Sequence, residues 1–334
     1  MKKHYNVAIA GATGAVGADM LRVLAERNFP INNLRLLASA RSIGKKLIFK
    51  DKEIEVEELT HDSFENIDIA LFSAGASRSV EFAPSAVKAG AIVVDNSSAF
   101  RMDPDVPLIV PEVNPEDALK HKGIIANPNC STIIMVVPVA PLHKAKKLKR
   151  VIASTYQAVS GAGVKGMQEL ELQTMQIMKN EKIKPEKFPY QIAFNLFPHI
   201  DVFLENDYTK EEMKMVFETR KIMGLPELKV NCTCVRLPVF RAHSESLLLE
   251  FEEDITPDEA RQILASSPGV KVLDNVSENI YPMPITASGK DDVLVGRIRQ
   301  DISRNDKKGL SIFIAGDQLL KGAALNAVQI AELL

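Results

Sequence analysis

A strand followed by a glycine-rich turn and a helix constrains the fold of this chain more than any other feature. Val7–Ala10 is a short apolar run typical of a buried strand, and an amphipathic pattern continues to about Arg27. Between them stand Gly11, Gly14 and Gly17, in the spacing G-x-x-G-x-x-G. Glycines there allow a tight turn and a close backbone approach, so that a pyrophosphate can lie on the helix N-terminus. The segment predicts a dinucleotide-binding unit; the alternative is a glycine-rich connection that serves packing alone.

Short apolar runs alternate with helical patterns along the first part of the chain. Leu34–Ala38, Ile67–Phe72 and Ala91–Asp95 are typical of buried strands, and Ala83–Ala89 has a helical pattern. This alternation predicts a parallel sheet covered on both faces.

The pattern changes after Cys130. Val151–Val159 predicts a long strand, and Asn231–Leu237 and Ser246–Glu252 alternate in the way of antiparallel strands with one exposed face. Helices are expected at Glu211–Met223, at Pro257–Ala265 and over the final stretch from residue 318 to residue 334. We therefore expect an α/β protein with a Rossmann-type nucleotide-binding domain over residues 1–129 with 316–334, and an α+β domain over residues 130–315.

The loop after the second predicted strand distinguishes between cofactors. Enzymes that use NAD commonly place an acidic residue there, on the ribose hydroxyl. This chain has Ser39 and Arg41, followed by Lys45 and Lys46. Hydrogen-bond donors and positive charge suit a ribose 2′-phosphate, so the loop predicts NADP; a solvated basic loop is the alternative.

A single thiol stands apart from the other cysteines. Cys130 lies in Asn127–Thr132, directly before the apolar run Ile133–Val137, which places it at a loop-to-helix junction. The N–H groups of a helix N-terminus favour a thiolate and can also hold a developing oxyanion. Cys232 and Cys234 face one side of a strand and are expected to be structural, with no metal site. A thiol nucleophile with a hydride carrier suggests oxidation or reduction of an acyl group through a thioester.

Several charged residues are candidates for the same site. A nucleophilic thiol needs a nearby base, and His243 lies in what we interpret as a loop between two strands, whereas His199 is as easily structural. Anionic substrates require cations, and the candidates are Arg101, Arg236 and Lys214. Lys214 shares a helix face with Glu211, three residues earlier. Taken alone, each is also compatible with an ordinary surface charge.

Bulk composition narrows the class of protein. The 334 residues suffice for about two domains. The net charge of −2 provides no field that attracts nucleic acid or a membrane surface. Three cysteines imply no disulfide framework. The N-terminal residues lack a signal-peptide pattern, so we expect a cytoplasmic location.

Taken together, these segments resemble the aspartate-β-semialdehyde dehydrogenase family from end to end. The resemblance is carried by the following motifs: Gly11–Gly17, Asp95–Arg101, Val110–Asn114, Asn127–Thr132, Tyr156–Gly163, Phe197–Ile200, Arg236–Val239 and Ala242–Glu245.

The resemblance implies a role for each candidate. Cys130 is expected to be the nucleophile, His243 the acid/base, and Gln157 the residue that positions the substrate or the acyl intermediate. The substrate-binding residues are expected to be Arg236 for the carboxylate, Glu211 for the amino group, and Arg101 with Lys214 for the phosphate. The expected NADP contacts are Gly11, Thr13, Gly14, Ala15, Val16, Ser39, Arg41, Ser160, Gly161 and Gln318.

The implied reaction is the reversible, NADPH-dependent reductive dephosphorylation of L-4-aspartyl phosphate to L-aspartate 4-semialdehyde. It supplies the biosynthesis of diaminopimelate and lysine, threonine, methionine and isoleucine. The resemblance also implies that the second domain is catalytic and forms a homodimer through its sheet, or a dimer of dimers. Two alternatives remain: an N-acetyl-γ-glutamyl-phosphate reductase, which the Glu211 carboxylate disfavours, and a non-catalytic NADP-binding sensor.

Overall fold

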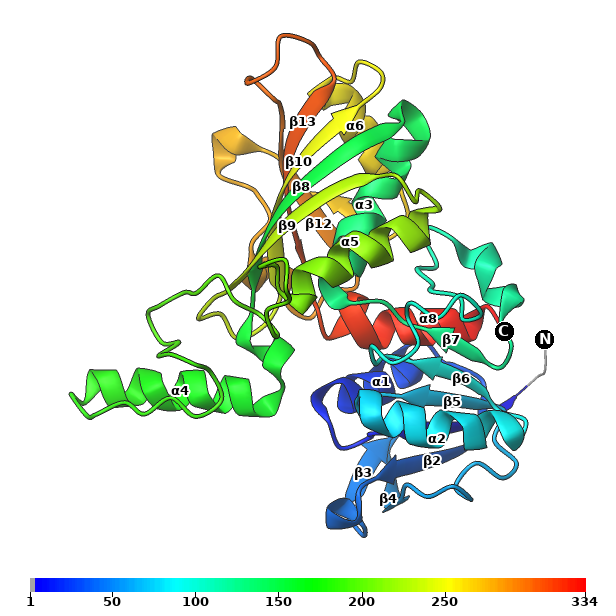
Figure 1. Ribbon diagram of the computed structural model, residues 1–334. Helices are drawn as coiled ribbons and strands as arrows, with labels where there is room; N and C mark the ends of the chain where they lie inside the picture. The colour runs from blue at the N-terminus through cyan, green and yellow to red at the C-terminus, as the bar shows by residue number, and fades with distance from the viewer. Residues whose placement is uncertain (1–3) are drawn as a thin grey trace. The chain divides into compact units, whose positions relative to one another are not determined.

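The computed structural model describes residues 4–334 and divides them into two compact units (Figure 1). The first unit contains the residues up to Asn129 together with Gly322–Leu334, and the second contains Cys130–Lys321. Residues 316–321 therefore belong to the second unit, whereas the expected division placed them in the first.

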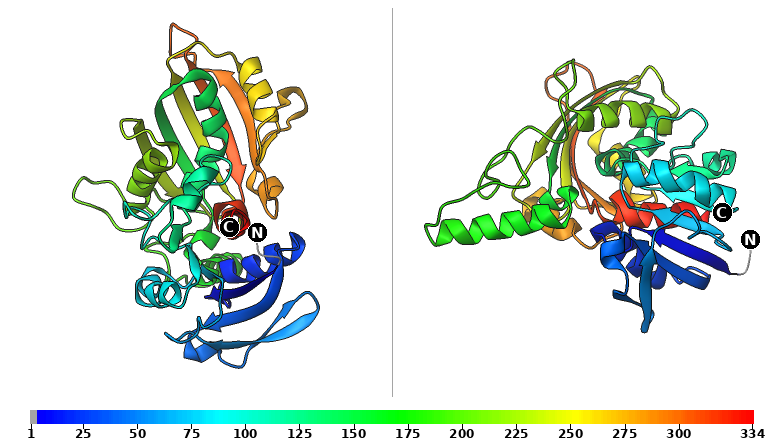
Figure 2. Two further views of the ribbon diagram at one scale, coloured as in Figure 1. Left: turned by 90° about the vertical axis from the view of Figure 1, so that its right-hand side faces the viewer. Right: turned by 60° about the horizontal axis from the view of Figure 1, so that its bottom comes forward.

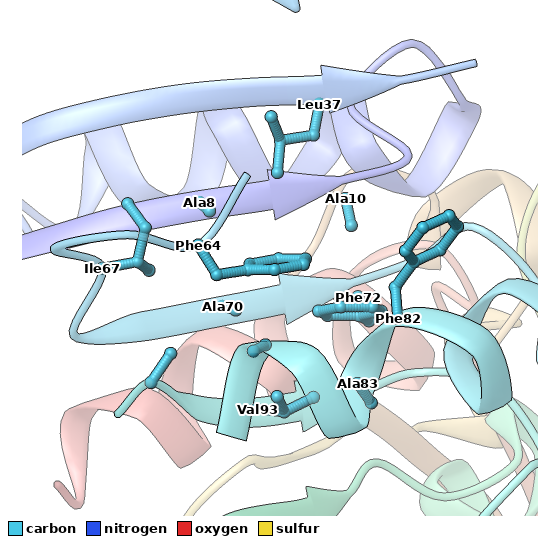
Figure 3. Close-up of a cluster of buried hydrophobic side chains, with 12 residues drawn as sticks. Ala8, Ala10, Leu37, Phe64, Ile67, Ala70, Phe72, Phe82, Ala83 and Val93 are labelled. Carbon is cyan, nitrogen blue, oxygen red and sulfur yellow. The ribbon is translucent and has the colours of Figure 1, made fainter. Parts of the chain in front are cut away.

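The first unit is built on a seven-stranded sheet in the order β3-β4-β2-β1-β5-β6-β7. All neighbours are parallel except the edge strand β3, which is antiparallel to β4. The strands are β1 (Tyr5–Ala10), β2 (Ile31–Ala38), β3 (Lys46–Phe49), β4 (Lys52–Glu58), β5 (Ile69–Phe72), β6 (Ile92–Asp95) and β7 (Ile124–Ala126). Helix α2 (Ala76–Lys88) covers one face, and α1 (Ala15–Glu26) and α8 (Leu325–Glu332) lie on the other (Figure 3). The expected parallel sheet with two covered faces is present.

A buried cluster holds α2 against this sheet (Figure 3). The rings of Phe64 and Phe72 stack with their centroids 5.6 Å apart, and Phe82 approaches from α2. Small residues on the strands, including Ala8 and Ala70, leave room for these rings. Burial of such large apolar side chains contributes about 1.5–3 kcal/mol for each one.

The second unit contains a six-stranded sheet in the order β11-β12-β13-β10-β8-β9. The strands are β8 (Leu148–Gln157), β9 (Lys229–Arg236), β10 (His243–Phe251), β11 (Val270–Val272), β12 (Val293–Gln300) and β13 (Gly309–Gly316). The helices are α3 (Cys130–Lys146), α4 (Val164–Met178), α5 (Lys210–Met223), α6 (Pro257–Ala265) and the single turn α7 (Pro284–Ala287). Helices α3, α5 and α6 lie on one face of the sheet, and α4 extends away from it (Figures 1 and 2).

Two expectations for this sheet are corrected. The alternating pattern of β9 suggested an antiparallel strand, but β9 pairs with β8 in parallel, while β10 is antiparallel to both β8 and β13. An alternating pattern of apolar and polar residues shows that a strand has one exposed face, but it does not show whether the strand is parallel or antiparallel to its neighbour. His243, expected in a loop, is the first residue of β10. The positive φ of 70° at Ala242 marks the turn that precedes the strand.

The start of α5 closes the exposed edge of the second sheet. Thr209 caps the helix, and Glu212 accepts a hydrogen bond from the Thr209 N–H, completing a capping box. The other carboxylate oxygen of Glu212 accepts from the N–H of Cys234 on the edge strand β9, at 2.9 Å. One side chain thereby satisfies both a helix end and a strand edge, which fixes α5 beside β9.

The end of the chain also departs from expectation. Instead of one amphipathic helix, a π-helical turn at Leu320–Ala324 precedes α8. Over residues 4–334, no helix combines the length and apolarity needed to cross a bilayer.

Candidate active site

Three predicted site residues meet at one end of the second sheet because of its topology. The parallel strands β8 and β9 end together, with Gln157 paired to Arg236. Strand β10 runs in the opposite direction, so its first residue, His243, lies one position beyond the Tyr156–Ser244 pair and beside the end of β8. All three side chains are at least nine-tenths buried.

Cys130 is the first residue of α3, as the sequence predicted, and its side chain is partly exposed. Burial lowers the pKa of the Arg236 guanidinium, while the charges of Glu211 and Cys130 oppose that shift. The thiol thus lies within electrostatic reach of Arg236. Burial raises the pKa of Cys232 and Cys234, so that both remain protonated thiols within the core. Their structural assignment fits this burial.

His243 is held in one protonation state. The N–H of Ala158 donates to its Nδ1 at 3.1 Å, and because that nitrogen accepts, the neutral ring carries its proton on Nε2. Burial, and then the charge of Arg236, lower the pKa of His243 well below its ordinary value. No residue of the described chain bonds to Nε2. At neutral pH the ring is therefore uncharged and has an N–H to offer.

The amide of Gln157 is oriented from both sides. Its Oε1 accepts from the hydroxyl of Thr155 at 2.9 Å, and its Nε2 donates to Glu211 at 3.1 Å. Glu211 also pairs with Lys214 at 3.1 Å, and Lys214 pairs with Asp201 at 2.8 Å. Burial lowers the pKa of Lys214, but these two carboxylates more than offset that effect, so the pKa lies above its ordinary value. Sequence analysis did not predict a role for Thr155 or Asp201.

The backbone at Gly161 passes close to the side chains of Arg236 and His243. Nη1 of Arg236 donates to the Ala158 carbonyl at 2.6 Å, and its guanidinium carbon lies 5.9 Å from the centre of the Phe188 ring. A Cβ added at Gly161 would come within 3.0 Å of Nη1 of Arg236 and 3.3 Å of the His243 ring. Glycine at this position therefore leaves room beside both functional groups.

Two of the expected NADP contacts join this end of the second unit. Gln318 donates to the hydroxyl of Ser160, and its Oε1 accepts from the N–H of Ala242 at 2.8 Å. These bonds connect the segment after β13 to the turn before His243 and to the 3₁₀ turn at Val159–Ala162. Ser160, Gly161 and Gln318 are thus neighbours of His243 within the second unit.

The remaining expected NADP contacts lie in the first unit. A cavity of about 490 Å³ opens there, and its lining includes the predicted residues Gly11, Thr13, Gly14, Ser39 and Arg41. Ala15 and Val16 begin α1 and do not line it. Residues that sequence analysis missed complete the lining: Ala38, Ala40, Glu58, Leu59, Ser73, Ala74, Arg78 and Phe82. Arg78 and Phe82 belong to α2, which begins earlier than its pattern suggested.

The local geometry of this cavity fits a phosphate-containing cofactor. Gly11 has φ of 92°, and a Cβ there would lie 2.5 Å from the Ser73 carbonyl oxygen. A Cβ at Gly17 would lie 2.3 Å from the Gly11 carbonyl oxygen. No described side chain caps α1, so N–H groups of its first turn remain available to an anion. Arg41 supplies positive charge at the end of β2.

Arg101 also lies in the first unit and is not an ordinary surface charge. Its side chain is 93% buried, with 7% exposed. Nε donates to the Asn127 carbonyl at 3.0 Å, and Nη2 donates to the Asn96 carbonyl at 3.1 Å. Both of these acceptors are main-chain oxygens that follow strands of the first sheet. Within residues 4–334, no group of three or more His, Cys, Asp or Glu side chains is arranged to hold a metal ion.

Comparisons with known proteins cover both units. The family model described as "Semialdehyde dehydrogenase, NAD binding domain" matches residues 6–121, and "Semialdehyde dehydrogenase, dimerisation domain" matches residues 139–321. The aspartate-semialdehyde dehydrogenase of Aquifex aeolicus (strain VF5) is 59% identical over 99% of this chain and 98% of its own length. That of Bacillus subtilis (strain 168) is 53% identical over the same shares.

Solved structures agree with this match. Aspartate semialdehyde dehydrogenase II from Vibrio cholerae, complexed with ASA, superposes with a TM-score of 0.97 at 47% identity, covering 100% of this chain and 98% of that chain. Aspartate semialdehyde dehydrogenase from Candida albicans, solved with NADP, gives a TM-score of 0.76 at 26% identity, covering 99% and 98%. The resemblance and the fold class inferred from the motifs are confirmed. The chain belongs to the aspartate-semialdehyde dehydrogenase family of oxidoreductases.

Proposed function

We propose that this chain catalyses the NADPH-dependent reductive dephosphorylation of L-4-aspartyl phosphate to L-aspartate 4-semialdehyde, and the reverse reaction. The observation that carries the proposal is the grouping of Gln157, Arg236 and His243 at one end of a single sheet, with Glu211 bonded to Gln157 and with Cys130 near enough for its charge to act on Arg236. It combines a nucleophile, a proton donor, a cation for a carboxylate and an anion for an ammonium group. The substrate carries those two charges at its amino-acid end.

Cys130 and His243 share the covalent chemistry in this proposal. The Cys130 sulfur attacks the acyl carbon, the carbon–oxygen bond to phosphate breaks, and phosphate leaves with its electron pair. When bound, NADPH would supply the hydride for reduction of the resulting thioester. His243 relays the proton that the Cys130 thiol loses to the leaving phosphate and ends as a neutral ring. The thiohemiacetal anion that hydride addition forms then expels the Cys130 sulfur, which releases the aldehyde and restores Cys130 as a thiolate.

The remaining residues bind and orient. Arg236 forms a bidentate pair with the substrate carboxylate, Glu211 binds the ammonium group, and Gln157 holds the acyl oxygen. Arg101 and Lys214 bind the phosphate. Arg41 and Ser39 bind the 2′-phosphate of NADP, which lies along Gly11, Thr13, Gly14, Ala15 and Val16. Ser160, Gly161 and Gln318 contact its nicotinamide end.

One comparison of substrates tests the proposal. Initial rates are measured with L-4-aspartyl phosphate and with N-acetyl-L-glutamyl 5-phosphate, each with NADPH and with NADH. We expect one phosphate released for each NADPH oxidised, with aspartyl phosphate only, since an acetylated nitrogen has no charge for Glu211 to attract. Faster turnover of the N-acetylated substrate would make the chain a reductase of that class. Tight NADPH binding without turnover of either substrate would indicate a sensor.

We also propose that the chain forms a homodimer through the outer face of the second sheet. Alternate residues of β8, β10 and β13 on the face opposite the helices are only partly buried, including Tyr156, Leu248 and Phe313. The rings of Tyr156 and Phe313 lie 6.1 Å apart. Leu248→Lys should convert the dimer to a monomer in sedimentation, whereas a dimer of dimers in the parent protein would reveal a second interface.

The cysteines support a cytoplasmic location, which we propose as the place of this reaction. Cys130, Cys232 and Cys234 are all free thiols, and the proposed mechanism requires the first to remain reduced. Location of a tagged chain by cell fractionation tests this, and recovery outside the cytoplasm would contradict it.

A further inference from the structure

Three asparagine side chains form a continuous line of hydrogen bonds in the first unit. Nδ2 of Asn326, on α8, donates to Oδ1 of Asn127 at 2.7 Å. Nδ2 of Asn127 then donates to Oδ1 of Asn96 at 2.6 Å. Asn127 and Asn326 are fully buried. Each amide is therefore oriented by its neighbour, and a buried amide left without its partner costs about 1–3 kcal/mol.

This line ends on the two carbonyl groups that hold Arg101. Nε of Arg101 donates to the main-chain oxygen of Asn127, and Nη2 donates to the main-chain oxygen of Asn96. Asn96 follows β6, and Asn127 follows β7, so both carbonyls belong to segments that have just left the sheet. The side-chain bond between Asn96 and Asn127, together with the main-chain bond from the Asn127 N–H to the Asp95 carbonyl at 2.8 Å, keeps these two segments at a fixed separation. The orientation of the guanidinium depends on that separation.

Asn326 anchors the line to the body of the unit. Its Nδ2 also donates to the main-chain oxygen of Ile109 at 2.9 Å, which uses the second amide hydrogen. Asn326 is 199 residues away from Asn127 in the sequence. Without it, Asn127 would lose the partner of its Oδ1, and its amide would be held only through Nδ2, which donates to Asn96 and, at 3.4 Å, to the Ala323 carbonyl.

We infer that Asn326 is a positioning residue for Arg101, acting through Asn127 and Asn96. Its contribution to phosphate binding rests on the proposed function, in which Arg101 binds the phosphate; its contribution to the orientation of Arg101 does not. No described contact places Asn326 on a substrate, so its effect is indirect.

The kinetic test uses the reverse reaction, in which semialdehyde and inorganic phosphate are separate substrates. Asn326→Leu keeps the approximate size of the side chain and removes both donors. We expect the KM for phosphate to rise about fivefold, as for the net loss of one hydrogen bond, with the KM for semialdehyde changed by less than about twofold. If Asn326→Leu does not fold, Asn326→Ser is measured in its place, and the same changes in the two KM values are expected.

Gln329→Leu is the matched control. Gln329 lies three residues later on α8 and donates to Glu112 at 3.1 Å, outside the asparagine line. The control should leave the KM for phosphate unchanged. If it raises this KM as much as Asn326→Leu does, the effect belongs to α8 in general and the inference is overturned.

A double variant tests whether Asn326 acts through Arg101. Adding Asn326→Leu to Arg101→Lys should raise the KM for phosphate no further than Arg101→Lys alone does. The effects of two substitutions that act through the same group are not additive. Full additivity would overturn the inference.

A spectroscopic measurement separates this inference from the proposed function. In the parent protein labelled with ¹⁵N-arginine, the Nε–H of Arg101, assigned by its loss in Arg101→Lys, should exchange slowly with water. It should exchange rapidly in Asn326→Leu and remain slow in Gln329→Leu. Slow exchange in Asn326→Leu would overturn the inference. If Arg101→Lys leaves the KM for phosphate unchanged, the phosphate assignment fails, while the exchange data still decide whether Asn326 positions Arg101.

Discussion

Ala158 holds the ring of His243 through a hydrogen bond of 3.1 Å from its main-chain N–H to Nδ1. This bond places the proton of the neutral ring on Nε2, and burial beside Arg236 lowers the pKa of the ring well below its ordinary value. At neutral pH His243 is thereby an uncharged ring that presents an N–H at Nε2.

We predict that His243→Gln lowers kcat by about 10²–10⁴-fold, the usual contribution of general acid–base catalysis. The pKa of His243 lies below its ordinary value. Protonation of His243 should therefore lower kcat/KM only as the pH falls below about 6.5, which produces an acidic limb in the pH profile. The limb should be absent from the variant. A limb that persists unchanged in His243→Gln belongs to another group and would remove His243 from this role.

Glu245 provides a prediction about stability. Its side chain is fully buried on β10, and neither carboxylate oxygen has a hydrogen-bond partner among the described residues. Burial, and then the charge of Glu211, raise its pKa well above the ordinary value. The folded chain thus retains a proton that the unfolded chain loses near pH 4.5. The contribution of Glu245 to stability is therefore most favourable below that pH and falls as the pH rises toward the folded pKa.

Glu245→Gln removes this dependence. We expect the variant to gain stability relative to the parent between pH 5 and pH 8, by up to about 1.4 kcal/mol for each pH unit above 4.5, until the pH reaches the folded pKa. Urea unfolding at equal protein concentration measures the difference. The control is Glu250→Gln, on the same strand, where the carboxylate pairs with Arg150 at 3.3 Å. A parent-to-variant difference that is independent of pH would show that Glu245 is ionised in the fold.

Arg41 provides a prediction about cofactor choice. It lines the cavity of the first unit near the glycine-rich turn. Arg41→Ala should raise the KM for NADPH by about one to two decades and leave the KM for NADH nearly unchanged, since a charged hydrogen bond contributes roughly 1.5–3 kcal/mol. Lys45→Ala, in the same loop but outside the cavity lining, is the control. Equal losses with both cofactors would mean that Arg41 does not contact the 2′-phosphate.

The two arginines that are assigned to anions should respond differently. Lysine keeps the charge of arginine but loses its planar fork. In the reverse reaction, Arg101→Lys should raise the KM for phosphate, and Arg236→Lys should raise the KM for semialdehyde. Each variant is the control for the other. The opposite pattern would mean that the substrate lies in the reverse orientation, and the roles of Glu211 and Lys214 would change with it.

Features fixed by local chemistry were predictable from the sequence. Cys130 begins α3, and Pro257 begins α6, as the sequence predicted. Glu211 and Lys214 share a helix face and form an ion pair. The glycine-rich turn lies between β1 and α1 as expected. Each of these depends on residues close together in the chain.

Features that depend on distant residues were not predictable. The hairpin of β3 and β4 turns at Lys50 and Asp51, both with positive φ, and lacks the glycine that would signal such a turn. The alternation in β9 carried no information about its direction. Ala158 and Asn326 become important only through side chains or backbone groups that the fold brings beside them.

The most direct test of the account is the thioester on Cys130. The enzyme is mixed rapidly with L-4-aspartyl phosphate in the absence of NADPH, and released phosphate and the mass of the protein are measured. The account predicts one phosphate for each active site and an aspartyl adduct on the peptide that contains Cys130, with neither product formed by Cys130→Ser. An equal burst of phosphate from Cys130→Ser, or a turning-over parent enzyme that forms no adduct, would contradict it.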